Sequence, residues 1–152
     1  MTTYLPDVNI IVASLRGDHS CHESAQAFLR QAKDGGDSFR VPIDVLASVM
    51  RVLTLGCWVN PESSATAGDL ARAWLGAARA EVIAHPADSW RVFLEFARTL
   101  NLTTRTMPDA LLAASAIASR TVLVTFDRGF TRYPGLQVDL LDPRATSTRP
   151  SD

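Results

Sequence analysis

The chain has 152 residues and a formal net charge of −1, with 47% hydrophobic and 20% charged residues. This size and balance predict one soluble globular domain with a sizeable core. The near-neutral charge excludes the strongly basic character of a general nucleic-acid binder, and no apolar stretch has the roughly 18 residues of a membrane-spanning helix. We expect a cytoplasmic location, because no basic leader precedes the first apolar segment.

The two cysteines do not form a recognisable metal-binding pattern. The segment HSCHE places His19 and His22 on either side of Cys21, while Cys57 is isolated. A zinc site needs a second pair of ligands, and the sequence offers none at suitable spacing. We therefore expect free thiols here, with Cys21 in a loop that leads into the first turn of a helix.

The first apolar segment, YLPDVNIIVASL at residues 4–15, predicts a short strand that continues into a helix. Asp7 and Asn9 are the polar residues near its start. Taken alone, Asp7 has two interpretations. It could cap the helix, or it could be a metal or phosphate ligand at the carboxyl end of a central strand.

Helices are predicted for much of the middle of the chain. Residues 21–33 have an apolar helical face and are followed by DGGD, which ends a helix. In the segment 39–55, Pro42 stands near the start of a second helix. Residues 60–80 predict a long alanine-rich helix with Asn60 as its N-cap and Pro61 as its first residue.

The second half of the chain alternates strands and helices. Short strands are predicted at 81–86, 121–127 and 136–142, and helices at 88–102 and 107–120. The helix at 107–120 is apolar nearly all round and should be central. The alternation predicts an α/β fold in which helices flank a mainly parallel sheet, as one domain over residues 1–142. Residues 143–152 read as a disordered tail.

Three aspartates stand where strands end or helices begin. Asp7 follows the first strand, Asp109 lies in the first turn of the helix at 107–120, and Asp127 follows the strand TVLVTF. The carboxyl ends of parallel strands and the N-termini of the adjoining helices share one edge of a sheet, so the three acids should converge. Clustered carboxylates are stabilised by a divalent cation, and oxygen ligands suit Mg²⁺ or Mn²⁺.

Large aromatic residues occur on two of the predicted helices. Trp74 lies in the helix at 60–80, and Trp90 and Phe93 lie in the helix at 88–102. Such side chains fill cores, which is the favoured interpretation, but they are also enriched at protein interfaces. A binding groove beside Trp74 is the alternative hypothesis.

Three segments, in this order, resemble a known family. They are LPDVNIIVASL, VPIDVLASVMRVLT and MPDALLAASAIASRTVLVTFDRGFTRYPGLQV. Together they resemble PIN domains of the VapC toxin type over almost the entire chain. The resemblance implies a three-layer α/β/α fold and a Mg²⁺- or Mn²⁺-dependent endoribonuclease, usually a homodimer. It also implies a VapB-type antitoxin whose C-terminal segment lies across the active cleft.

The resemblance assigns roles to individual positions. Asp7, Asp109 and Asp127 match the family's catalytic and metal-binding acids. Asn9 matches a polar residue two places after the first acid, and Thr125 matches a hydroxyl residue that supports the last one.

One position departs from the family pattern. A glutamate usually stands three residues before the arginine of the second matching segment, but counting back from Arg51 gives Ser48. Asp44 lies one helical turn earlier on the same face. Our hypothesis is that Asp44 partly substitutes as a metal ligand, through a bound water. The alternative is an ordinary acid in the first turn of a helix.

The predicted reaction is hydrolysis of RNA phosphodiester bonds, in single-stranded or looped RNA. Arg128 and Arg132, beside the last acid, are placed to contact substrate phosphates. The alternative function is a weakened or inactive PIN-like module that binds antitoxin or RNA, with Ser48 marking the loss of chemistry. Phosphatases of the haloacid dehalogenase type and receiver domains fit poorly, since Asn9 stands where the former need a second aspartate and the late lysine of both is missing.

Overall fold

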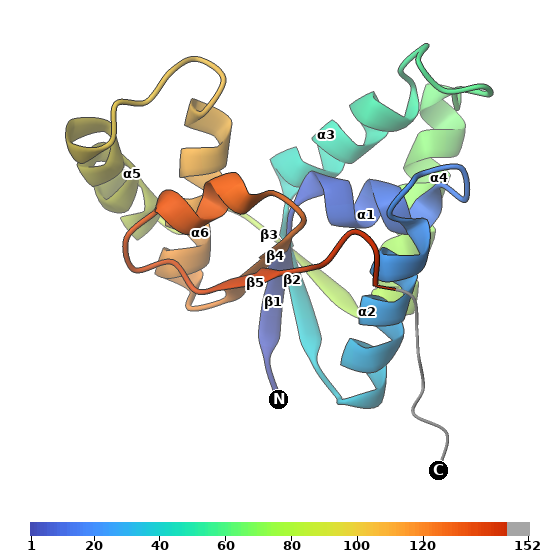
Figure 1. Cartoon of the computed structure of the whole chain (residues 1–152), viewed down its shortest axis with the longest axis horizontal. Coiled ribbons are helices and arrows are strands. Elements are labelled where there is room, and N and C mark those ends of the chain that lie inside the picture. Colours follow the sequence, from blue (N-terminus) through green and yellow to red (C-terminus); the bar gives the residue numbers. More distant parts are fainter. Residues whose placement is uncertain (146–152) are drawn as a thin grey trace.

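A parallel five-stranded sheet forms the centre of the computed structural model, which describes residues 1–145 (Figure 1). The strand order is β3-β2-β1-β4-β5, and every neighbouring pair is parallel. The strands are β1 (Thr3–Pro6), β2 (Ser38–Pro42), β3 (Ala80–Ile83), β4 (Val122–Thr125) and β5 (Val138–Leu140). The α-helices are α1 (Val8–Leu15), α2 (His22–Asp34), α3 (Ile43–Leu53), α4 (Ser64–Ala78), α5 (Asp88–Thr99) and α6 (Met107–Ser119). The predicted α/β class is confirmed.

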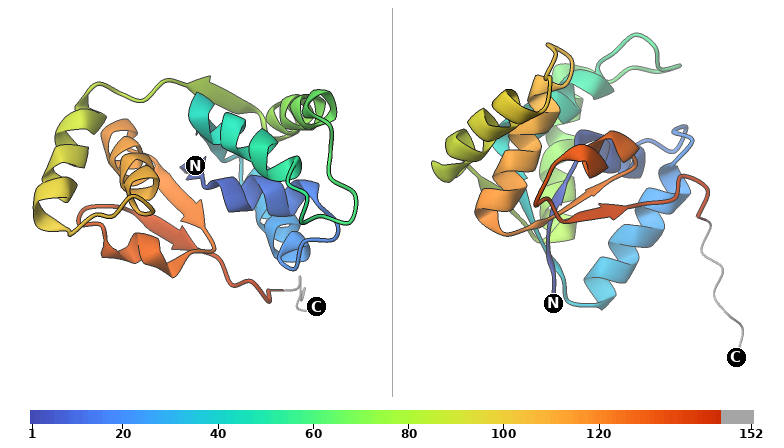
Figure 2. Two further views of the ribbon diagram at one scale, coloured as in Figure 1. Left: turned by 90° about the horizontal axis from the view of Figure 1, so that it is seen from above. Right: turned by 60° about the vertical axis from the view of Figure 1, so that its left-hand side comes forward.

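The helices form two layers with the sheet between them. Helices α1, α2, α3 and α4 lie on one side, and α5 packs against α6 on the other (Figures 1 and 2). A short 3₁₀ helix, η1 (Arg128–Arg132), connects β4 to β5. The three-layer α/β/α arrangement that the resemblance implied is therefore confirmed.

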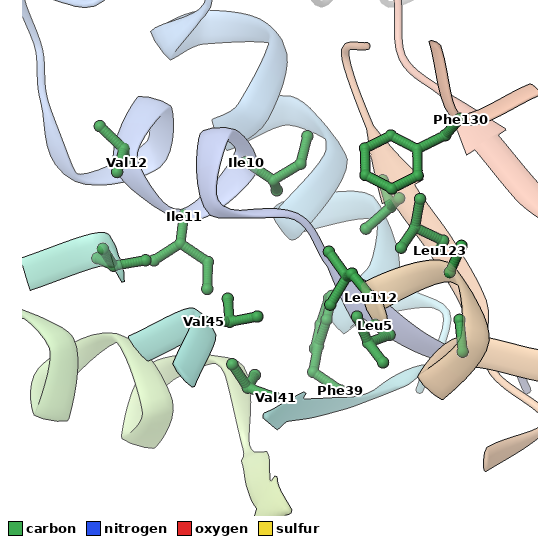
Figure 3. Packing of buried hydrophobic residues seen from close by; sticks show 14 of the residues in the cluster. Leu5, Ile10, Ile11, Val12, Phe39, Val41, Val45, Leu112, Leu123 and Phe130 are labelled. Carbon is green, nitrogen blue, oxygen red and sulfur yellow. The ribbon is translucent and has the colours of Figure 1, made fainter. Parts of the chain in front are cut away.

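The core lies where the central strands meet both helical layers. Leu5 on β1 and Leu123 on β4 have no exposed surface, and Ile11 of α1 and Leu112 of α6 pack around them from the two layers (Figure 3). Burial of side chains of this size contributes about 1.5–3 kcal/mol each. This packing fixes the carboxyl end of β1, and with it the position of Asp7.

Strand β2 was not anticipated, because the sequence suggested only a helix start at Pro42. Pro42 is in fact the last residue of β2 and the N-cap of α3. The five residues SFRVP are too short and too mixed in polarity to show a period of two. The strand forms because β1 and β3 pair with it on both sides.

The predicted start of the α4 helix was wrong. Asn60 and Pro61 lie in the preceding loop, and Ser63 is the N-cap, with its hydroxyl oxygen accepting a hydrogen bond from the Thr66 amide at 3.1 Å. Both Asn60 and Ser63 are favourable capping residues, and the structure uses the second. By contrast, the expected loop and helix start around Cys21 are confirmed, since Cys21 is the N-cap of α2.

Of the large aromatic residues on these helices, Trp74 lies in the core and Trp90 lies at the surface. Trp74 is 5% exposed, and its indole N–H donates to Ser14 Oγ at 3.0 Å. Trp90 is 63% exposed and stacks on Phe93 with a ring-centroid distance of 6.0 Å. The core interpretation therefore holds for Trp74 and not for Trp90.

The last part of the chain lies largely outside the described residues. Of the predicted disordered tail at 143–152, only 143–145 are described, and they form a turn in which the Arg144 amide donates to Asp142 Oδ1 at 2.9 Å. Within residues 1–145, no helix combines the length and the apolar character needed to cross a membrane.

A nearly buried arginine connects two loops at the far end of α1. The Arg16 guanidinium donates to both carboxylate oxygens of Asp18, at 2.8 and 2.6 Å, and to the Asn60 carbonyl at 2.9 Å. It also lies 4.6 Å from the ring centroid of Trp58. These contacts attach the segment after α1 to the loop that precedes α4.

We predict that Arg16→Ala lowers the free energy of unfolding by about 1–2 kcal/mol, through lost packing and hydrogen bonds at a single site. Urea unfolding at neutral pH measures the change. Arg72→Ala is the matched control, because that side chain is 84% exposed in its pair with Asp69, and it should shift stability by less than about 0.5 kcal/mol. Equal effects of the two substitutions would contradict a structural role for Arg16.

Candidate active site

The three predicted acids stand around the carboxyl edge of the sheet. Asp7 directly follows β1 and is the N-cap of α1, while Asp127 lies two residues after β4 and is the N-cap of η1. Asp109 lies in the first turn of α6, the helix that leads back into β4. Because β1 and β4 are neighbouring parallel strands, their ends carry Asp7 and Asp127 to the same place.

Asp7 is held by hydrogen bonds to both carboxylate oxygens. Its Oδ1 accepts from the Val8 amide at 2.7 Å, and its Oδ2 accepts from the Thr125 hydroxyl at 2.9 Å. Its own amide donates to the Val124 carbonyl at 2.9 Å, which extends the pairing of β1 with β4. The side chain is only 8% exposed. The capping role of Asp7 is therefore real, and it fixes the carboxylate at the edge of the sheet.

Thr125 links the first acid to the last. It is fully buried, donates to Asp7, and accepts from the Asp127 amide at 3.0 Å. Asp127 Oδ1 in turn accepts from the Gly129 amide at 2.7 Å. A Cβ at Gly129 would lie 3.0 Å from that oxygen, so the close turn favours glycine.

The electrostatics of the three acids are mutually unfavourable. The pKa of Asp7 is raised to about 6, chiefly by burial and to a smaller extent by the nearby charges of Asp109 and Asp127, and its two hydrogen bonds only partly offset these effects. The pKa of Asp109 is also raised, first by burial and then by Asp127. Within residues 1–145, none of the three carboxylates forms a salt bridge. The site therefore carries negative charge without a matching cation.

Two residues near the site were missed by the sequence analysis. Arg105 lowers the pKa of Asp109 from its position in the turn before α6. Tyr133 is 4% exposed, and the pKa of its hydroxyl is raised by burial and by Asp109 and Asp127. The spacing of Arg105, four residues before an acid, was a usable signal. Tyr133 offered none, because its position depends on how η1 packs.

The other predicted contact residues are solvent-accessible. Asn9 is exposed in the first turn of α1, and Arg128 and Arg132 are exposed on η1 directly after Asp127. The Arg132 guanidinium lies 5.7 Å from the ring centroid of Tyr133. Both cations therefore follow Asp127 closely in the chain and are accessible to an incoming anion.

Asp44 has a different partner from the one we hypothesised. Its Oδ1 lies 2.8 Å from His85 Nε2, and the side chain is about half exposed. Ser48, one turn further along α3, is partly buried. The charges that raise the pKa of Asp7 come from Asp109 and Asp127. The structure thus brings together three of the four acids that we considered.

The donor set of the three acids suits a hard divalent cation. Asp7 is buried, has no cationic partner in the described part of the chain, and is destabilised by two neighbouring carboxylates. Among residues 1–145 no group of three acidic, histidine or cysteine side chains is already arranged around one ion position. Mg²⁺ typically retains several waters and takes only one or two protein carboxylates, so the residues present fit it.

The raised pKa of Asp7 predicts how the metal-free protein responds to pH. Because the folded-state pKa lies above the unfolded value, ionised Asp7 costs stability. The penalty is absent at pH values below about 4 and complete above about 6. Asp7→Asn removes the penalty and should stabilise the metal-free protein at pH 8 by on the order of 2 kcal/mol, with little gain at pH 4.

Thermal and urea unfolding in EDTA at both pH values measure this difference. Asp69→Asn is the control, because Asp69 is an exposed carboxylate on α4 and the substitution should leave stability unchanged at both pH values. A loss of stability in Asp7→Asn at pH 8 would show that the hydrogen bonds of the carboxylate outweigh its burial.

Comparisons with known proteins identify the family and the fold of the chain. The family model described as "PIN domain" matches residues 4–136. Ribonuclease VapC43 of Mycobacterium tuberculosis is 28% identical over 132 residues, which cover 86% of this chain and 90% of that protein. Ribonuclease VapC31 of the same species is 29% identical over 139 residues, which cover 88% and 95%.

Solved structures share the fold. VapBC2 from Rickettsia felis, bound to a DNA fragment from its promoter, superposes with a TM-score of 0.73 at 22% identity, covering 93% of this chain and all of that one. FitAcB from Neisseria gonorrhoeae gives a TM-score of 0.67 at 18% identity, covering 92% and 97%. Because the family model matches residues 4–136, which include all six α-helices and all three acids, the chain belongs to the PIN domain family.

Proposed function

We propose that this protein is a Mg²⁺- or Mn²⁺-dependent endoribonuclease, the VapC-type toxin of a toxin–antitoxin pair. The observation that supports it most directly is the group of three carboxylates without a salt-bridge partner among the described residues, one of which, Asp7, is buried and fixed by two hydrogen bonds. The similarity to proteins named VapC ribonucleases supports the choice of substrate. A toxin of this kind acts in the cytoplasm, which remains our expectation.

Each residue has a role in this proposal. Asp7, Asp109 and Asp127 would hold the cation, which when bound supplies Lewis-acid activation of water and neutralises charge that develops at phosphorus. Thr125 and the Val8 amide orient Asp7. We assign Arg128 and Arg132 to the substrate phosphates, because guanidinium groups bind phosphate oxygens in pairs.

Arg105 and Asn9 have smaller roles in the proposal. Arg105 carries a positive charge close enough to Asp109 to lower its pKa. It would therefore partly offset the burial and the Asp127 charge that raise this pKa, and it would also attract the substrate. Asn9 is exposed one turn into α1, where its amide could hydrogen-bond to a phosphate oxygen or to a bound water.

We predict that the wild-type protein cleaves single-stranded or looped RNA in Mg²⁺ or Mn²⁺, and that Asp7→Asn, Asp109→Asn and Asp127→Asn each lower the rate by at least about a hundredfold. Single-turnover cleavage of a labelled structured RNA measures it. The control is Asp69→Asn, which should cleave as fast as the wild type. Cleavage by Asp7→Asn at the wild-type rate, or wild-type cleavage in EDTA, would contradict the proposal.

Ser48 supports one alternative function. With a neutral residue on α3 and with Asp44 bonded to His85, this helix supplies no unengaged carboxylate at either position. A PIN-like module that has lost cleavage and acts by binding antitoxin or RNA would fit that observation. RNA binding without cleavage in either metal would favour this alternative.

An apolar hollow beside Trp74 is our candidate for antitoxin binding. A cavity of about 370 Å³ lies between α2, α4 and β2, with Leu29, Phe39 and Trp74 among its lining residues. Arg30, Lys33 and Arg79 add positive charge around it. We therefore infer an antitoxin segment that places apolar side chains in the hollow and acidic residues along its rim.

Ala77→Arg tests this groove, because Ala77 is an exposed lining residue of the hollow. A large side chain there should weaken antitoxin binding by at least about tenfold. The matched control is Ala65→Arg, an exposed alanine on the same helix away from the hollow. Calorimetric titration with the cognate antitoxin measures both affinities, and an unchanged affinity for Ala77→Arg would place the antitoxin elsewhere.

We also retain the homodimer as a proposal. Trp90 is 63% exposed and stacked on Phe93 at the surface of α5, and large exposed aromatic surfaces are favoured at interfaces. Light scattering of the purified protein reports the oligomeric state directly.

A further inference from the structure

A chain of four polar side chains runs from the surface into the interior. His85 Nε2 hydrogen-bonds to Asp44 Oδ1 at 2.8 Å, and His85 Nδ1 hydrogen-bonds to Ser115 Oγ. Ser115 Oγ in turn lies within hydrogen-bond distance of Ser89 Oγ, at 3.3 Å. Ser115 and Ser89 are buried, His85 is 25% exposed, and Asp44 is about half exposed.

Ser115 is unusual in its surroundings. It is the one polar residue between Ala110 and Ala118 of α6. A buried hydroxyl without a partner costs about 1–3 kcal/mol, and an alanine there would cost nothing of the kind. Among residues 1–145, the hydroxyl contacts His85 and Ser89 as its hydrogen-bond partners. The buried Ser115 hydroxyl thus stands at the position where His85 contacts α6.

The order Asp–His–Ser is that of a nucleophilic triad, but the burial excludes that chemistry. A nucleophilic serine must reach a substrate carbonyl or phosphorus, and Ser115 has no exposed surface. Both ring nitrogens of His85 are already hydrogen-bonded. The arrangement therefore acts by holding elements together.

His85 connects the two helical layers across the carboxyl edge of the sheet. It follows the edge strand β3, and Pro86 restricts its backbone to extended conformations. Asp44 lies on α3, which packs on α1 and α4, whereas Ser115 lies on α6, which packs on α5. Figures 1 and 2 show α3 and the α5–α6 pair on opposite sides of the sheet.

We propose that His85 is a positioning residue that holds α3 to α6 and so fixes the place of Asp109 relative to Ser48. We call the hydrogen-bonded group of Asp44, His85 and Ser115 the clasp. In this proposal Asp44 anchors the clasp and does not bind the metal. The proposal rests on the proposed ribonuclease function. It explains why the nearest carboxylate to Ser48 on its helix is turned to a histidine. A misplacement of about 1 Å in a catalytic site can lower the rate a hundredfold, so a clasp of this kind has a measurable effect.

The first experiment compares Asp44→Asn with Asp44→Ala and His85→Ala. The clasp needs a hydrogen-bond acceptor at position 44 but no charge, because an asparagine oxygen also accepts from His85. Asp44→Asn should therefore retain RNA cleavage and Mg²⁺-induced thermal stabilisation. His85→Ala and Asp44→Ala should lower kcat about ten- to a hundredfold with Mg²⁺ binding retained. His22→Ala is the control, since His22 bonds only to the Ala13 carbonyl, away from the three acids.

The same variants overturn the proposal if Asp44 is a ligand. Asp44→Asn would then lose Mg²⁺-induced stabilisation as completely as Asp7→Asn. Wild-type kcat in both His85→Ala and Ser115→Ala would also overturn it. If His85→Ala does not fold, Ser115→Ala breaks the same hydrogen bond from the other end.

A distance measurement tests the clasp independently of activity. Ala47 on α3 and Ala97 on α5 are both exposed, so each can be replaced by a cysteine that carries a spin label. Cys21→Ser and Cys57→Ser remove the native thiols. The distance distribution should broaden or lengthen in His85→Ala and stay narrow in His22→Ala. An unchanged distribution in His85→Ala would contradict the clasp. Failure of wild-type RNA cleavage, by contrast, would contradict the proposed function and leave this measurement decisive.

Discussion

The rest of the site depends on a buried carboxylate that the fold cannot neutralise by itself. Asp7 closes β1, caps α1 and accepts a hydrogen bond from Thr125 on the neighbouring strand. An N-cap contributes about 1 kcal/mol, which does not offset a pKa raised to about 6 by burial and by two further acids. The protein thus maintains an unfavourable charge at a buried, hydrogen-bonded position, which is characteristic of functional sites.

The elements that hold this charge are the same ones that build the sheet. The Asp7 amide continues the pairing of β1 with β4, so the register of these strands determines where the carboxylate lies. Thr125 then couples the first and last acids through one hydroxyl group. Conformational freedom is small here, because every one of these groups is fixed by the backbone or by a buried hydrogen bond.

Ser48 is neutral where the family pattern has a glutamate, so the predicted ligand set has one negative charge fewer. Three carboxylates remain, and a Mg²⁺ ion that keeps most of its waters needs only one or two of them. The nearest acid on the same helix, Asp44, is hydrogen-bonded to His85, and His85 connects α3 to α6 through Ser115. We infer that α3, which carries Ser48 in place of the glutamate, helps to position the site through the bond between Asp44 and His85.

Much of the site could be predicted because its residues follow local rules. Asp7, Asp109 and Asp127 each stand beside a strand end or a helix start, and both kinds of boundary leave clear signals in the sequence. The features that the sequence did not reveal depend on tertiary contacts. The strand β2 forms through its neighbours, and Tyr133 reaches the acids only once η1 is packed.

The bond between Asp44 and His85 was missed for the same reason. It joins residues 41 positions apart, which no periodicity links. The N-cap of α4 was predicted wrongly for a different reason, because Asn60 and Ser63 are equally favourable capping residues and the sequence does not distinguish them.

Crystals grown with Mn²⁺ and measured at the manganese absorption edge test the central claim most directly. We expect an anomalous peak at about 2.2 Å from a carboxylate oxygen of Asp7, also in contact with Asp109 or Asp127, and with Asp44 still bonded to His85. Diffraction data from Mn²⁺-containing crystals that show no anomalous peak among these three acids would contradict it.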